Sequence, residues 1–116
     1  MRPAAFEDEI VDESIQLLSV SGELDMASSG ELRRLVERAL HAGRNCVVID
    51  LNGVTHMDSS ALAALITGHQ LIQVRGGRLA LVISTESLRR TLEVRGLDRL
   101  FVIKPDRESA VAAVCD

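Results

Sequence analysis

One short segment carries the side chains that are best placed for chemistry. Asp58, Ser59 and Ser60 follow a hydrophobic run and stand where a helical pattern begins. Asp is favoured at a helix start because its carboxylate accepts hydrogen bonds from free backbone N–H groups. A phosphoryl group on an exposed hydroxyl there would meet unpaired N–H groups and the positive end of the helix dipole. Both helix capping alone and phosphorylation of Ser59 therefore fit this segment.

A nucleophilic role for Ser59 is a third interpretation, because serine also serves hydrolases of the Ser-His-Asp type. The chain contains no GxSxG segment, which presents the nucleophile in one large class of hydrolases. His56 and Asp58 are close neighbours of Ser59, whereas triad members normally come together from separated parts of a fold. We therefore expect a protein that is not an enzyme, in which His56 is a solvated loop residue.

A second polar segment, SGELDMASSGEL at residues 21–32, also follows a predicted strand. Gly22 can adopt a turn conformation that other residues disfavour, and Asp25 is expected to cap or precede the next helix. Sites in α/β sheets gather beyond the carboxyl ends of the strands. We therefore expect this turn and Ser59 to share one edge of the sheet.

The spacing of apolar residues predicts the first elements that position these segments. A strand begins at Ser14 and ends at Gly22, and the helix that follows is ended by Gly43. Ser28 and Glu31 have the spacing of a capping box near the start of this helix. Its apolar stripe consists of Leu32, Leu35, Val36, Ala39 and Leu40.

The remainder of the chain alternates between strands and helices. Residues 46–51 and 78–83 are continuous apolar runs, as expected for strands buried on both faces of a parallel sheet. Between them a helix spans about 59–75 and is closed by Gly76-Gly77. A third helix capped by Thr85, a strand at 100–103 and a helix at 107–114 complete the pattern. The inner face of the helix at 59–75 is formed by Leu62, Leu65, Ile66 and His69.

Consecutive strand–helix units predict an α/β layer fold with a mixed, mostly parallel sheet of four to five strands and about four helices. The length fits a single domain over residues 1–116. Residues 1–13 are poorly patterned, with a short edge strand at 4–6 as one possibility. An early strand is expected to join the sheet antiparallel to the others.

The bulk composition argues against several kinds of site. The net charge is −4 and the basic residues are scattered, which argues against nucleic-acid binding and against a polybasic membrane anchor. No run approaches a membrane span, and the first residues lack the apolar core of a signal peptide, so we expect a cytoplasmic protein. Cys46 is expected in the core and Cys115 in a fraying tail, and no metal or cofactor motif occurs.

These segments in this order resemble the STAS domain, and specifically the stand-alone bacterial anti-sigma-factor antagonists. The resemblance covers about residues 14–114. It rests on SGELDMASSGELRRLVERAL, CVVIDLNGVTHMDSSALAALI and GGRLALVISTESLRRTLEVRGLDRLFVI. The middle segment is the most specific, because a strand, a short loop, Asp-Ser-Ser and a small-residue helix resemble the family's phosphorylation motif.

The resemblance implies a phosphorylation-controlled binding protein that regulates transcription by partner switching, typically in a stress response. Such an antagonist binds an anti-sigma factor that is also a serine kinase, and binding frees a sigma factor. The kinase uses its own ATP to phosphorylate the antagonist, which then loses affinity, and a phosphatase resets it. Carried over, the acceptor is Ser59, flanked by Asp58 and Ser60. The implied partner-binding residues are Gly22, Glu23, Asp25, His56, Met57, Ala61 and Leu62.

One departure from the family pattern is Ala61, where glycine is frequent. Its methyl group is expected to affect how closely a kinase approaches, without removing the acceptor. A different function also fits the resemblance, namely a STAS scaffold or a subunit of a signalling or transporter-associated assembly in which Ser59 is never modified. Phosphate on Ser59 after treatment with a cognate kinase separates these two functions.

Overall fold

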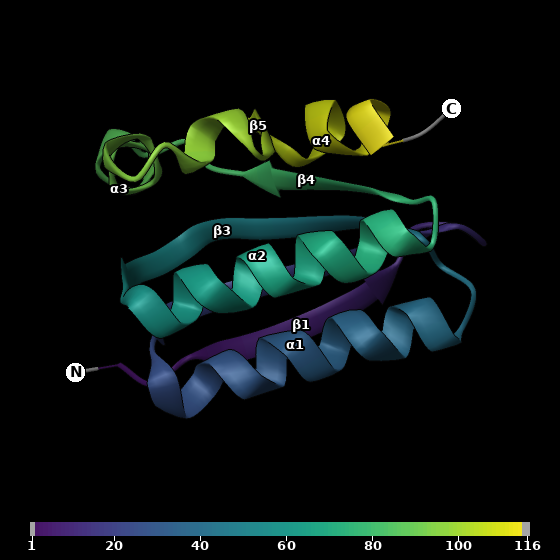
Figure 1. Cartoon of the computed structure of the whole chain (residues 1–116), viewed down its shortest axis with the longest axis horizontal. Coiled ribbons are helices and arrows are strands. Elements are labelled where there is room, and N and C mark those ends of the chain that lie inside the picture. Colours follow the sequence, from purple (N-terminus) through teal and green to yellow (C-terminus); the bar gives the residue numbers. More distant parts are fainter. Residues whose placement is uncertain (1, 115–116) are drawn as a thin grey trace.

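The hydrophobic runs of the sequence form the centre of one five-stranded sheet in the computed structural model, which describes residues 2–114 (Figure 1). The strand order is β1-β2-β3-β4-β5. The elements in chain order are β1 (Ala5–Ile10), β2 (Ile15–Leu24), α1 (Met26–His41), β3 (Cys46–Met57), α2 (Ser59–Val74), β4 (Arg78–Val82), α3 (Glu86–Val94), a 3₁₀ turn (Leu97–Arg99), β5 (Val102–Lys104) and α4 (Arg107–Val114).

The sheet is mixed and mostly parallel, as predicted. β2, β3, β4 and β5 pair in parallel, and β1 pairs antiparallel with β2. The edge strand predicted at residues 4–6 is longer and runs to Ile10. Phe6, Asp8 and Ile10 pair with Val20, Leu18 and Gln16 of β2, and of these three β1 residues only Phe6 is partly buried. The sequence pattern missed this length because β1 is acidic and largely exposed.

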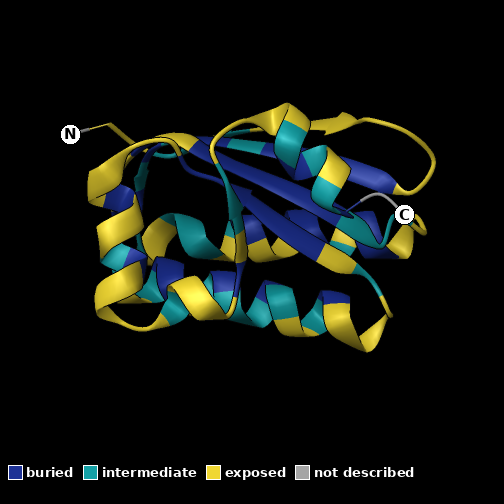
Figure 2. Cartoon of the chain, turned by 90° about the horizontal axis from the view of Figure 1, so that it is seen from above, coloured by how far each residue is buried: buried dark blue, intermediate teal, exposed yellow. Residues whose placement is uncertain are grey.

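Helices cover both faces of the sheet. Residues of α1, α2 and α3 pack with alternate strand residues such as Leu18, Ile49 and Leu81 in the larger core. Ala110 and Val114 of α4 pack on the opposite face against residues such as Val48 and Val82. Figure 2 shows the buried strands between these two helical layers. The continuous apolar runs are therefore explained by burial on both faces.

Several predicted boundaries need correction. β3 continues to Met57, so Asp58 follows the strand directly and His56 lies in the strand rather than in a loop. α1 begins at Met26, and its capping box is Asp25–Ser28 rather than Ser28–Glu31. Glu31 instead pairs with Arg34 on the helix surface. Tertiary pairing with β2 extends β3 through polar residues that alone would favour a turn.

Smaller corrections concern the ends of other elements and the cysteines. Thr85 precedes α3 but makes no side-chain capping bond. The last strand is Val102–Lys104 rather than 100–103, because Leu100 and Phe101 still belong to the turn that follows the 3₁₀ helix (Leu97–Arg99). Cys46 is half-buried rather than fully within the core, and Cys115 lies outside the described residues. No helix in the described part of the chain is long and apolar enough to cross a membrane.

A polar cluster joins α4 to the sheet. The carboxylate of Asp50, only 7% exposed, accepts a hydrogen bond from Nε of Arg107. The same guanidinium donates to the Ser19 hydroxyl at 2.9 Å. A buried carboxylate needs such partners because its desolvation is costly. This pairing fixes the start of α4 over β2 and β3.

Candidate functional site

Asp58 joins the beginnings of two helices. Its Oδ1 accepts a hydrogen bond from the Ala61 amide at 3.0 Å, which caps α2 as predicted. Its Oδ2 accepts from the Met26 amide, the first residue of α1, at 3.2 Å. One carboxylate therefore satisfies free N–H groups of both helices, where the positive ends of the two helix dipoles meet.

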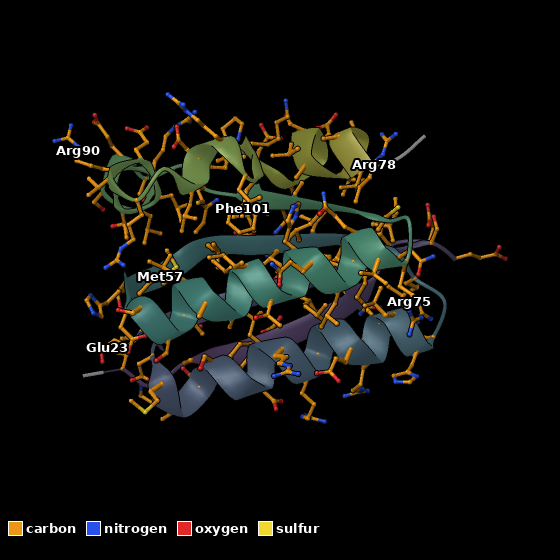
Figure 3. All side chains as sticks on the ribbon, viewed as in Figure 1. Glu23, Met57, Arg75, Arg78, Arg90 and Phe101 are labelled. Atoms are coloured by element: carbon orange, nitrogen blue, oxygen red, sulfur yellow. The ribbon has the colours of Figure 1, made fainter. Side chains whose placement is uncertain are left out.

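Asp25 caps α1 from the other side of this junction. Its Oδ1 accepts from the Ala27 amide at 3.1 Å, and its own amide donates to the Ser28 hydroxyl at 3.0 Å. β2 and β3 are in register here, with Glu23 opposite His56. The prediction that the 21–32 segment and Ser59 share one edge of the sheet is therefore confirmed. Figure 3 shows Glu23 and Met57 at this end, and Arg75 and Arg78 at the other.

Ser59 is the first residue of α2 and is exposed, whereas Ser60 is half-buried. Neither hydroxyl makes a side-chain hydrogen bond within residues 2–114. The Ser59 Oγ is thus accessible and has no structural task. A hydroxyl with these properties can accept a phosphoryl group without loss of a native contact.

The residues implied as partner-binding divide into two groups. Glu23, Asp25 and His56 are at least partly exposed and offer contact surface. The other four are buried and support the exposed residues of the site rather than offering contact surface: Gly22, Met57, Ala61 and Leu62.

Ala61 is fully buried, at 0% exposure, so its methyl group does not face an approaching protein. The expected effect of this residue on the approach of a kinase is therefore not supported by its position. Its amide serves the Asp58 cap instead. Gly22 has φ +84°, and a Cβ there would lie 2.3 Å from the carbonyl oxygen of Pro3, so the turn requires glycine.

Met26 is a site residue that sequence reasoning missed. Its side chain is 77% exposed, although its amide is held by Asp58. Its position outside the apolar stripe of α1 is the signal that could have identified it. A large exposed apolar side chain beside a cluster of carboxylates is suited to contact with a protein partner.

A shallow cavity of about 390 Å³ lies beside Met26, between the N-terminal segment and the start of α1. Pro3, Asp25 and Ser28 are among its lining residues. No group of three or more His, Cys, Asp or Glu residues in the described chain could hold a metal ion. The site therefore consists of a hydroxyl, carboxylates bound to helix amides, and an exposed apolar side chain.

The chain is similar to known proteins in sequence and fold. The STAS domain model matches residues 9–110. An anti-sigma F factor antagonist from Paenibacillus polymyxa is 28% identical over 99 residues, which is 84% of each chain.

Two solved structures have the same fold. An anti-sigma factor antagonist from Mycobacterium paratuberculosis superposes with a TM-score of 0.84 at 26% identity, over 98% of this chain and 96% of that one. The phosphorylated form of the Bacillus cell fate determinant SpoIIAA gives 0.74 at 21% identity, over 96% and 100% of the two chains. The second likeness shows the fold alone.

Proposed function

On the premise that this chain belongs to the STAS domain family, we propose that it is an anti-sigma factor antagonist. It binds an anti-sigma factor and so frees a sigma factor for transcription. The similarity to antagonists from two other bacteria supports this function. The observation that carries it is the exposed, unbonded hydroxyl of Ser59 directly after Asp58, at the mouth of α2.

The anti-sigma factor is also a serine kinase in this proposal, and the antagonist is its substrate rather than an enzyme. The Ser59 Oγ attacks the γ-phosphorus of ATP held by the kinase. The bond from that phosphorus to the bridging oxygen breaks, ADP leaves, and the hydroxyl proton passes to a base of the kinase. A phosphatase later hydrolyses the ester. ATP belongs to the partner, and this chain needs no cofactor.

Phosphorylation weakens binding through charge. A phosphoserine carries about −1.5 to −2 charges at neutral pH. On Ser59 it would stand next to Asp58, at the edge that also carries Glu23 and Asp25. The helix dipole compensates only about 0.3–1 kcal/mol at an exposed end. A partner surface must then bury an uncompensated cluster of negative charge, which costs several kcal/mol.

The acceptor is tested with the purified anti-sigma kinase, ATP and mass spectrometry. We expect one phosphate on the parent and on Ser60→Ala, and none on Ser59→Ala. Ser60→Ala is the matched control, because it removes the neighbouring half-buried hydroxyl. Phosphate that persists in Ser59→Ala and disappears in Ser60→Ala reverses the assignment. No phosphate on the parent would favour a STAS scaffold.

Affinity for the same partner tests the switch. Calorimetry is expected to give at least tenfold weaker binding for Ser59→Asp, which corresponds to about 1.4 kcal/mol, and near-parent binding for Ser59→Ala. Circular dichroism of both variants should match the parent, because Ser59 lies outside the core. Tight binding by the genuinely phosphorylated protein would end the proposal.

A further inference from the structure

A large open cavity lies at the opposite end of the molecule from Ser59. It has a volume of about 670 Å³ and opens between the far end of β1, the start of β2 and the last turn of α1. Arg38, His41 and Arg44 line it together with Gln16 and Asp8. The size is within the range of small-molecule sites in proteins. The antagonist function proposed above does not use this cavity.

Arg44 lies at this cavity, and its side chain has no hydrogen-bond or ion-pair partner among residues 2–114. Its amide donates to the carbonyl of Ala39 at 2.9 Å, and the loop turns at Gly43 with φ +83°. Its Nε is buried and has no hydrogen-bond acceptor in the described chain. A buried cationic donor without an acceptor is costly, so native proteins rarely retain one without a water or an ion that satisfies it.

Gln16 is a second polar group without a partner in this cavity. It is 6% exposed, on the face of β2 where Leu18 and Val20 belong to the core. Its side chain makes no hydrogen bond within residues 2–114. A polar residue at the end of an apolar row supplies an amide donor to the cavity floor.

The charges around the cavity define the ligand. Neither Arg38 nor Arg44 forms an ion pair in the described part of the chain. Asp12 of the nearby β1–β2 turn is occupied, because its Oδ1 accepts from the Ser14 and Ile15 amides. Asp8 and the negative end of the α1 dipole oppose an anion, so attraction has to come from the two guanidinium groups. Guanidinium groups match the oxygens of phosphate in bidentate geometry.

We propose that this cavity, with Arg38, Arg44 and Gln16 as its donors, binds the phosphate group of a small molecule. Arg44 supplies a half-buried guanidinium in the cavity wall, and Arg38 supplies a second guanidinium at the exposed rim. Gln16 closes the floor with a neutral donor. The ligand therefore meets the chain at the end of α1 opposite to the Ser59 edge.

The test is an NMR titration of the full chain with inorganic diphosphate at constant ionic strength. We expect saturable shifts of the amides of Gln16 and of residues 38–44, and Arg44→Gln should raise the Kd at least tenfold. Arg38→Gln should raise it about threefold, and Asp8→Asn should lower it. Arg33→Gln is the matched control, because Arg33 is an exposed arginine of α1 that pairs with Glu37, and its Kd should equal that of the parent.

Three results would overturn the proposal. Shifts centred on residues 26–28 and 59–61 would place the anion at the helix beginnings instead. An unchanged Kd in both Arg44→Gln and Arg38→Gln would show that these two arginines do not bind the anion. Because Arg38 is exposed, Arg38→Gln still tests the proposal if Arg44→Gln fails to fold. Citrate binding as tightly as diphosphate would exclude selectivity for phosphate.

Discussion

The beginnings and the ends of α1 and α2 differ in how far their polar side chains are satisfied by hydrogen bonds. Where the helices begin, Asp25 and Asp58 accept hydrogen bonds from backbone amides, and the Ser59 and Ser60 hydroxyls have no side-chain hydrogen bond within residues 2–114. Where the helices end, Arg44 keeps a buried Nε without an acceptor in the described chain. The carboxylates at the helix beginnings are thus satisfied by backbone amides, whereas one guanidinium nitrogen at the helix ends is not satisfied within the described residues. Hydrogen-bond satisfaction thus distinguishes the proposed modification site from the proposed ligand site within one small fold.

The largest expected effect comes from adding a side chain at Gly77, where the backbone passes close to Asn45 near the ends of α1 and α2. A Cβ on Gly77 would lie 1.9 Å from the Asn45 carbonyl oxygen, which also accepts from the Arg78 amide. Gly77→Ala is therefore expected to lower the free energy of unfolding by about 3 kcal/mol, since backbone must move. Urea denaturation measures this. Ser59 phosphorylation by the kinase should stay unchanged in the folded variant if the two ends are independent.

Gly30→Ala is the matched control for that prediction. Gly30 lies within α1, and a Cβ there meets nothing within 4 Å. Its replacement by alanine should raise stability by about 0.5–1 kcal/mol, because alanine is the better helix former. Equal effects of the two substitutions would show that crowding at Asn45 is not the cause.

Asp58→Ala tests whether one carboxylate caps the beginnings of both α1 and α2. The substitution removes the acceptor of the Ala61 amide and that of the Met26 amide together. We expect a loss of about 2 kcal/mol, at the upper end of the range for a single helix cap. Asp25→Ala removes the cap of α1 alone and should cost about 1 kcal/mol. Thermal melting measures both, and equal losses would contradict the double role of Asp58.

Asp58→Asn refines this comparison. An amide side chain keeps one oxygen acceptor, so one of the two helices stays capped. Its stability should lie between those of the parent and Asp58→Ala. If Asp58 also orients Ser59, the phosphorylation rate of Asp58→Ala should fall by more than its loss of stability explains.

The smallest effect concerns the turn beside the cavity. The backbone amide of Ser14 lowers the pKa of Asp12 below its ordinary value of 3.8, helped by the Ser14 hydroxyl and the Ile15 amide. Because the folded pKa is depressed, this contribution to stability is present above pH 3.8 and is lost as pH falls through the lower folded pKa. Carboxyl NMR should find the inflection below 3.8. Ser14→Ala should move it upward without restoring it fully, because the amide contacts remain.

Sequence patterns predicted most of the fold because its strands and helices carry strong apolar periodicity. The capping roles of Asp58 and Asp25, and their common edge, followed from local chemistry and strand direction. The bond from Asp58 to Met26 could not be predicted, because it depends on how closely two helix ends approach. The same is true of the Arg107–Asp50–Ser19 cluster and of the cavity that joins Gln16 to Arg44. Long-range polar contacts leave no periodic signal in a single sequence.

The shared carboxylate of Asp58 makes the beginnings of α1 and α2 a thermodynamically coupled pair. A phosphate on Ser59 that draws the Ala61 amide away from Asp58 changes how firmly the Met26 amide is held. Linkage is reciprocal, so a protein that displaces Met26 alters the free energy of adding that phosphate by the same amount. Through the two hydrogen bonds of Asp58, a partner bound at Met26 would then influence how readily Ser59 is phosphorylated.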